Sequence, residues 1–169
     1  MIVNELQSLL TEICQKNGMP ALAFDEDQMV TTPFGEGQIL NLRFREDADD
    51  LTFVASLGEV PAEAQAAVLM ELMKGNFNWS ANGITFAWYE ALNQPIAQYR
   101  LACEGLTADA LNDALTRFLG TADDWSRHLR AFAAAVNVDD QEYGGGLEEM
   151  SFESGSSAAG LMNPDIIRG

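Results

Sequence analysis

The sequence predicts an α+β fold whose elements follow the order α-β-β-β-α-β-β-α. Two periodicities of the apolar residues carry this prediction. In three segments these residues recur every three to four positions, as on one face of a helix. In the segments between, they alternate with polar residues, as on a half-buried strand. Short polar loops join neighbouring strand segments, which is typical of hairpins and therefore of antiparallel pairing.

The first two helices have clear ends. The first is expected over residues 2–16 and stops at Asn17 and Gly18, which favour the C-terminal end of a helix. The second begins at Pro61, because proline is favoured at the first helical position, and closes near Gly75. Their apolar stripes are Ile2, Leu6, Leu9 and Ile13 in the first helix, and Val68, Leu69, Leu72 and Met73 in the second.

The clearest strand covers Gln38–Arg45. Leu40, Leu42 and Phe44 face one side, whereas the two arginines that alternate with them face the other. Two brief pieces separated by an acidic turn precede this strand, and a strand that returns after a polar loop follows it. A last hairpin lies beyond the second helix. These segments are residues 21–24 and 28–32, residues 51–55, and residues 84–89 with 95–103.

The last helix carries the longest apolar stripe. Thr107 can cap it, and Asp109 lies in its first turn, where the positive end of the helix dipole favours an acid. The apolar positions follow one another in alternating steps of four and three. We expect this stripe to pack on the chain's own sheet, and a dimer contact through this helix is the alternative. They are Leu111, Leu115, Phe118, Ala122, Trp125, Leu129, Phe132 and Val136.

The sequence changes character after this helix. Residues 1–137 are expected to form one domain, and residues 138–169 a flexible acidic tail that is rich in glycine, serine and alanine. Near the end of the tail stands a short apolar piece. We expect either that this piece is free or that it docks on the domain; its residues are Leu161, Met162, Ile166 and Ile167.

Charge and cysteine content narrow the class of protein. The 26 acidic and 9 basic residues give a formal net charge of -17, which repels nucleic acids and anionic lipids and suits a basic partner. The two isolated cysteines, Cys14 and Cys103, are expected as small core residues in a reducing compartment. The first ten residues, MIVNELQSLL, lack the basic n-region expected of a secretory signal, and no apolar run approaches the roughly 18 residues of a membrane span. We therefore expect a cytoplasmic protein without nucleic-acid or membrane partners.

No pattern in the sequence calls for an enzyme. His128 is the single histidine, and it lies on the last helix between Arg127 and Leu129. Neither a Ser-His-Asp nor a Cys-His constellation can be assembled around it. The Gly144–Gly146 run is not followed by the Lys-Ser/Thr pair of a phosphate loop, and the acids lack the spacing of a calcium loop. We expect no catalytic residues, no cofactor and no metal site.

Five local strings, taken in order, resemble a known family. They are LAFDED at residues 22–27, VASLG followed by VP at residues 54–61, LMKGNF at residues 72–77, TFAW at residues 85–88, and LTADAL at residues 106–111. In their order and spacing, and with the acidity of the chain, they resemble the Tir chaperone (CesT-type) family of type III secretion chaperones over about residues 2–132. The chain departs from the family's pattern at residues 28–37, which contain Pro33, and in its long tail.

The resemblance implies a fold, a function and partners. The fold is a twisted antiparallel sheet flanked by helices, in a homodimer of the bacterial cytoplasm. The function is to bind the N-terminal region of a secreted effector and keep it soluble and export-competent without ATP, with the secretion ATPase as a further partner. Effector contacts are expected at Val3, Leu6, Leu10, Phe24, Leu40, Leu42 and Phe44, and dimer contacts at Leu69, Leu72, Met73, Phe77, Trp79 and Phe86.

Alternatives remain open at this point. Each of the apolar residues just named can instead belong to the core of the chain. The same fold can serve a regulatory binding protein that sequesters a transcriptional regulator or a partner chaperone. An enzyme of an unrelated class is a further alternative. The apolar end of the tail suggests another hypothesis, that the tail folds back and shields the binding groove before an effector arrives.

Overall fold

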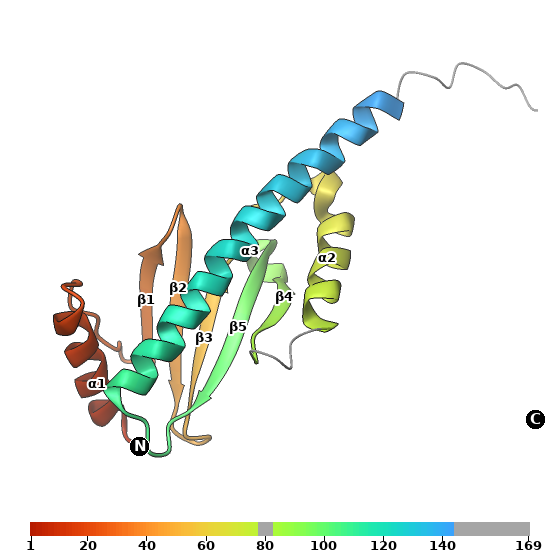
Figure 1. Ribbon diagram of the computed structural model, residues 1–169. Coiled ribbons are helices and arrows are strands. Elements are labelled where there is room, and N and C mark those ends of the chain that lie inside the picture. The colour runs from red at the N-terminus through yellow and green to blue at the C-terminus, as the bar shows by residue number, and fades with distance from the viewer. Residues whose placement is uncertain (78–82, 144–169) are drawn as a thin grey trace, which may run out of the picture.

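The described part of the computed structural model, residues 1–77 and 83–143, is built on a five-stranded antiparallel sheet with the strand order β1-β2-β3-β5-β4. The element order confirms the predicted α+β arrangement. Figure 1 shows α1 beside β1 at one side of the sheet, α2 beside β4 at the other, and α3 running obliquely between them. One face of the sheet is thus covered by helices, and its opposite face carries none of the described ones.

Helix α1 covers Val3–Lys16 and is fixed at both ends by local hydrogen bonds. The backbone N–H of Ile2 donates to Glu5 Oε2 at 3.0 Å, and the Asn17 side chain donates to the carbonyl of Ile13 at 3.0 Å. These contacts satisfy backbone groups that a helix end leaves without a partner. The buried face of the helix is formed by Leu6, Leu10, Ile13 and Cys14.

Three strands follow as a meander: β1 over Met29–Phe34, β2 over Gln38–Arg45 and β3 over Asp50–Ser56. In the register, Leu42 lies opposite Phe53, whereas Arg43 lies opposite Thr52. Because side chains alternate along a strand, the pair Leu42 and Phe53 points into the core and its neighbours point to the open face. This confirms the two-faced strand that the sequence predicts at Gln38–Arg45.

Residues 21–24 do not form the predicted strand; they are a loop. The physical reason is the Gln7 side chain on α1. Its Nε2 donates to the carbonyl of Leu22 at 2.9 Å, and its Oε1 accepts from the N–H of Phe24 at 2.9 Å. These backbone groups are therefore satisfied by a side chain and need no partner strand.

The second half contains the short helix η1 over Ala62–Ala64, helix α2 over Gln65–Phe77, and a hairpin. The hairpin consists of β4 over Thr85–Tyr89, the short helix η3 over Glu90–Leu92, and β5 over Gln94–Ala102. Gly75 allows α2 to approach α3, because a Cβ there would lie 2.4 Å from the Trp125 ring. The predicted hairpin and second helix are thus confirmed.

Helix α3 covers Ala108–Tyr143 and packs its predicted stripe on the sheet and on α1 and α2. Phe118 is fully buried and meets Phe53 edge-on, with ring centroids 5.5 Å apart. The helix continues past residue 137, where the sequence predicted the end of the domain, because no glycine or proline interrupts it before Gly144. The tail beyond Tyr143 lies outside the described residues.

The two cysteines lie in the core, as the sequence predicts. Cys14 and Cys103 are both 2% exposed or less, and neither forms a disulfide. Burial raises the pKa of the Cys103 thiol to about 11, with a smaller contribution from the nearby Asp49 carboxylate. Such a thiol is held in its uncharged form near neutral pH and acts as a small apolar side chain.

Candidate protein-binding surfaces

The exposed side of α2 is apolar, and we call it the α2 face. The side chains of Leu69, Met70, Met73 and Phe77 lie on it, with exposed fractions from 41% to 87%. The opposite side of the same helix packs Val68 and Leu72 into the core. A contiguous group of exposed apolar side chains on one helix, with Met and Phe among them, is typical of a protein interface.

The residues predicted for a dimer interface fall into two groups, those exposed on the α2 face and those buried in the core. Leu69, Met73 and Phe77 are exposed on it, so they are free to contact a second subunit. Leu72 and Phe86 are 2% and 8% exposed, and the structure places both in the chain's own core. Trp79 lies outside the described residues.

A second apolar surface lies where α1, β1 and α3 meet, and we call it the edge groove. It is a hollow of about 490 Å³. Leu10 and Ile13 of α1 and Leu119 of α3 contribute to its walls, and Met19 and Leu22 of the following loop close one end. Strand β1 forms its rim, with Phe34 pointing toward it.

Three of the seven residues predicted for effector contact line the edge groove: Leu10, Leu40 and Leu42. All three are 3% exposed or less, so they form its floor. Leu6 and Phe44 are deeper in the core, and Val3 and Phe24 are half-buried against it. Leu40, Leu42 and Phe44 lie on the side of β2 that the helices cover. The contact of the seven residues with an effector stays a prediction.

The outer edge of β1 is open over a short stretch. Among the strands of residues 1–77 and 83–143, β1 pairs with β2 alone, and Pro33 has no N–H to offer. The N–H of Met29 donates to Asp25 Oδ1 at 2.8 Å, and its carbonyl accepts from the N–H of Asp25 at 2.8 Å. Alternate residues of a strand point their backbone groups the same way, so Thr31 offers the outward N–H and carbonyl between these two positions.

The opposite edge of the sheet is closed at its centre. The Asn76 side chain lies beside β4, where its Nδ2 donates to the carbonyl of Phe86 at 2.8 Å and its Oδ1 accepts from the N–H of Phe86 at 2.7 Å. One amide side chain therefore satisfies the backbone groups that an added strand would use at that residue. An additional strand is accommodated better at β1 than at this point of β4.

The third surface lies on the open face of the sheet, and we call it the open-face groove. It is a hollow of about 440 Å³ with an apolar part and a basic part. Val54 on β3 lies opposite Asn41 and Gln98, and Ile39 on β2 and Ile96 on β5 lie diagonally to it on the same face. Tyr89 and Leu92 line the same hollow. The basic part is lined by Arg43, Arg45 and Arg100. This groove was not predicted from the sequence. Three apolar residues on strand faces that are otherwise polar were the signal that could have indicated it.

The charges of the open-face groove are unequally paired. Asp50 accepts from Arg45 Nε at 2.9 Å and from Nη2 at 2.5 Å, and Arg100 Nε lies 3.8 Å from the same carboxylate. The hydrogen bonds from Arg45 lower the pKa of Asp50 below its ordinary value. Within the described residues Arg43 makes no ion pair. Three further acids, Asp27, Glu46 and Asp47, line a neighbouring hollow together with Arg43 and Arg45. The residues that line the open-face groove itself include three arginines and no acid.

The histidine of the chain lies at the contact between α2 and α3. His128 is half-exposed, and its Nε2 lies 3.0 Å from Glu71 Oε1, which ties α3 to α2. Hydrogen bonds from Lys74, and secondly from His128, lower the pKa of Glu71. Within the same residues, no three His, Cys, Asp or Glu side chains are grouped as a metal site would require. None of the helices described combines the length and apolar character needed to cross a bilayer.

Comparison with known families and structures gives a consistent result. The model of the Tir chaperone protein (CesT) family matches residues 8–126. No curated protein matches this chain.

Three solved structures share the fold. A chain of the ExsC–ExsE complex is 21% identical, with a TM-score of 0.67 over 76% of this chain and 96% of that one. A chain of the HopA1–SchA chaperone–effector complex is 17% identical, with a TM-score of 0.58 over 75% and 98%. The Yersinia pestis type III secretion chaperone SycH, in complex with a stable fragment of YscM2, gives a match of 17% identity and a TM-score of 0.52, over 69% and 95%.

Proposed function

The chain belongs to the Tir chaperone protein (CesT) family, and from this premise we propose that it is a type III secretion chaperone acting as a homodimer in the bacterial cytoplasm. In this proposal it binds the N-terminal region of an effector and keeps that region extended and export-competent without ATP. The observation that carries the proposal is the edge groove, an apolar hollow that lies directly beside the open stretch of an edge strand.

The edge groove and β1 can act together on an extended segment. A strand added at Thr31 would form backbone hydrogen bonds, and its alternate side chains would point into the groove. Each apolar side chain that loses about 100 Å² of exposed area would contribute about 2.5 kcal/mol, offset by the ordering of the segment. Binding of this kind uses no nucleotide, because its free energy comes from burial and backbone pairing.

The α2 face supports the dimer. Leu69, Met70, Met73 and Phe77 are exposed together, and a second α2 face is the complementary surface that an isologous dimer would bring to it. Leu72 and Phe86, predicted for the same interface, would contribute from beneath by holding α2 on β4. The predicted contact with the secretion ATPase rests on the family resemblance alone and stays a prediction.

Copurification with the N-terminal region of a candidate effector, without nucleotide, tests the chaperone function. We expect a complex of two chaperone chains and one effector chain, measured by mass. Leu119→Glu and Met19→Glu place a charge in the edge groove and should each weaken binding by about tenfold or more. Ile2→Glu, at an exposed apolar residue outside the groove, is the control. Recovery of only a transcriptional regulator or another chaperone from the native cytoplasm would contradict the effector proposal.

The strand-addition part has its own matched pair of variants. Thr31→Pro removes the outward N–H and should weaken effector binding by roughly fivefold, the effect of one hydrogen bond of about 1 kcal/mol. Thr31→Val keeps that N–H and loses only the hydroxyl that donates to Asn41 Oδ1 at 2.7 Å. Equal affinities of the two variants would show that the effector does not pair with β1.

The dimer is tested by mass in solution. The double variant Met73→Glu and Phe77→Glu introduces four negative charges into a two-fold interface and should convert the dimer into a monomer. Leu92→Glu, which changes an exposed apolar residue away from α2, should leave the dimer intact. A dimer that survives the double variant at micromolar concentration would move the interface away from the α2 face.

A further inference from the structure

The open-face groove is the place on this chain where basic side chains gather. The sequence holds nine Lys and Arg residues, and three of them, Arg43, Arg45 and Arg100, line this one hollow. The apolar part of the groove adjoins them, with Ile39, Val54 and Ile96 on its floor. A matching occupant is therefore a peptide segment that carries both acidic and apolar side chains.

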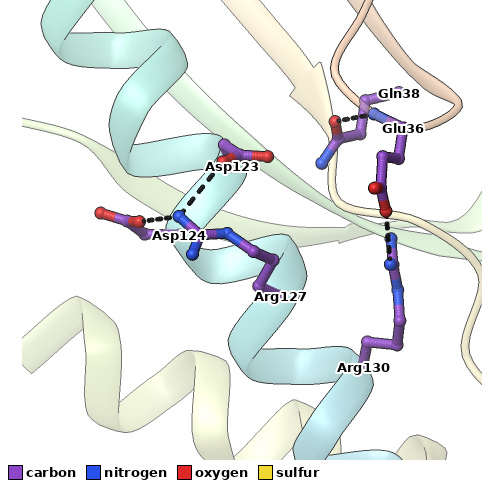
Figure 2. Close-up of polar contacts among 6 residues, drawn as sticks. All are labelled: Glu36, Gln38, Asp123, Asp124, Arg127 and Arg130. Carbon is purple, nitrogen blue, oxygen red and sulfur yellow. Dashed lines mark hydrogen bonds and ion pairs between the residues drawn. The ribbon is translucent and has the colours of Figure 1, made fainter.

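A continuous path leads from α3 to this groove. Arg130 on α3 donates from Nη1 to Glu36 Oε2 at 2.9 Å, which joins the helix to the turn between β1 and β2 (Figure 2). Beside this ion pair lies a second hollow of about 390 Å³, lined by Leu129 and Arg130. Its other lining residues include Ile39, Ser56 and Gln94, which also line the open-face groove. The two hollows are thus contiguous around the edge of the fold.

The Glu36 side of this path is held in place. The N–H of Glu36 donates to Gln38 Oε1 at 3.2 Å, and the Gln38 side chain is 2% exposed (Figure 2). Gly35 has a φ of +53°, and a Cβ there would lie 1.9 Å from the same Oε1, so the turn requires glycine. The hollow beside Arg130 is therefore part of the folded structure.

The segment that follows α3 has the composition that the groove requires. Residues 147–167 contain the acids Glu148, Glu149, Glu153 and Asp165 among apolar residues that end in the Leu161, Met162, Ile166 and Ile167 piece. We propose that residues 147–160 pass the Arg130 hollow and that residues 161–167 occupy the open-face groove of the same chain, with Asp165 beside Arg43 and Arg100. The tail would thereby cover an apolar surface whenever no other protein binds there.

The length of the chain permits this path. Tyr143 lies 13 helical residues beyond Arg130, about 20 Å along α3. Crossing the edge of the fold adds about 10 Å, and the run along β2 from Ile39 to Arg43 adds about 14 Å. The total of about 45 Å is spanned by roughly 14 extended residues, which leaves Leu161 and the residues after it free to lie in the groove.

Tethering and charge both favour this occupant. A segment joined to the fold by a short linker has an effective concentration in the millimolar range, so even weak contacts hold it. Elsewhere the acidic surface of the chain repels an acidic tail, whereas the arginine cluster attracts it. The proposal requires no effector, so it stands or fails independently of the chaperone function.

Arginine labelling of the full chain tests the inference. Phenylglyoxal modifies accessible arginines, and mass spectrometry reads each site. In a tail variant with Leu161, Met162, Ile166 and Ile167 all changed to Ser, we expect Arg43 and Arg100 to react at least about fivefold faster than in the wild type. Arg117, which packs on the Tyr99 ring at 5.5 Å on the helix-covered side, is the internal control and should react at an unchanged rate.

Reversing the charges on the tail and on the groove tests whether the acidic tail contacts the arginines. A labelled synthetic peptide of residues 144–169 should bind the tail variant and should bind the wild type at least tenfold more weakly, because the wild-type groove is already occupied. The same peptide with Asp165→Lys should bind only a tail variant that also carries Arg43→Glu and Arg100→Glu.

Two results would overturn the proposal. One is equal labelling of Arg43 and Arg100 in the wild type and the tail variant, with protection appearing only when an effector region is added. That result would assign the groove to the effector. The other is peptide binding that is indifferent to the arginines. Protection that falls on dilution would place the tail on a second copy of the chain instead of its own.

Discussion

The two faces of the sheet are formed by the same five strands, but one packs against helices and the other carries none of the described helices. On β3, Phe53 is fully buried under the helices and meets Tyr99 and Phe118 edge-on, whereas its neighbour Val54 points to the open face. The covered face carries the contacts that hold α1, α2 and α3, and the open face carries a groove with three arginines. Neighbouring residues of one strand thus serve stability on one face and a candidate binding surface on the other.

The largest expected effect tests that step directly. Phe53→Ala removes a fully buried ring and leaves a cavity among Tyr99 and Phe118, so it should lower the free energy of unfolding by about 3–5 kcal/mol. Val54→Ala, one residue further along, should lower it by about 1 kcal/mol or less because its site is partly open to water. Chemical denaturation at a fixed protein concentration measures both. Equal losses would mean that Val54 is packed in solution as tightly as Phe53.

The rate at which a cysteine thiol is alkylated also distinguishes the covered face of the sheet from its open face. Cys103 lies at the core side of the sheet, and with its pKa near 11 only about one thiol in a thousand is ionised at pH 8. We expect iodoacetamide to alkylate it at least roughly a hundredfold more slowly than a cysteine placed on the open face by Gln98→Cys in the tail variant, a difference of about 2.7 kcal/mol. Mass spectrometry separates the sites. Comparable rates would show that the core opens readily.

Much of the fold was predictable because it depends on periodicity. The alternation of Leu40, Leu42 and Phe44 with arginines gave the right faces of β2, and the steps along the last helix gave its buried stripe. Residues 21–24 were assigned wrongly because an apolar tetrapeptide looks alike in a strand and a loop. The Gln7 side chain, which satisfies that backbone from 15 residues away, decides between them.

The candidate surfaces were predictable only in part, for a related reason. Periodicity shows that Leu72 and Met73 lie on different sides of one helix, but both are apolar, and only the packing on Phe86 and Trp125 shows which side is inside. The same holds for the β2 leucines, which the chain's own helices cover. The open-face groove requires Ile39, Val54 and Ile96 to be brought together diagonally across three strands by their register. That register is a tertiary property.

The two edges of the sheet can be compared in the same way as its faces, and the expected change in the free energy of unfolding is of intermediate size. Asn76→Ala removes two hydrogen bonds from Phe86 and leaves its backbone groups without partners, so unfolding should become easier by about 2 kcal/mol. Asn41→Ala is the matched control, because the Asn41 side chain bonds only the exposed Thr31 hydroxyl, and about 0.5 kcal/mol is expected there. Unfolding curves give both values. A loss at Asn76 no greater than that at Asn41 would mean that the β4 edge is closed by something else.

The smallest expected effect concerns the ion pair of the open face and depends on pH. Asp50→Asn removes the charge that Arg45 and Arg100 share, and we expect a smaller loss of stability at pH 7 than for Asn76→Ala. Because the folded pKa of Asp50 is lowered, its contribution is fully present above the unfolded pKa of about 4 and is lost as the pH falls through the folded pKa. The stability gap between the wild type and Asp50→Asn should therefore be constant from pH 7 to pH 5 and narrow below pH 4.

Asp109→Asn, in an exposed pair with Lys16, is the control and should show a smaller gap throughout. If the Asp50→Asn gap instead stayed unchanged down to pH 3, the Asp50 carboxylate would not be held by the arginines of the groove, and the groove would carry more positive charge than the structure shows.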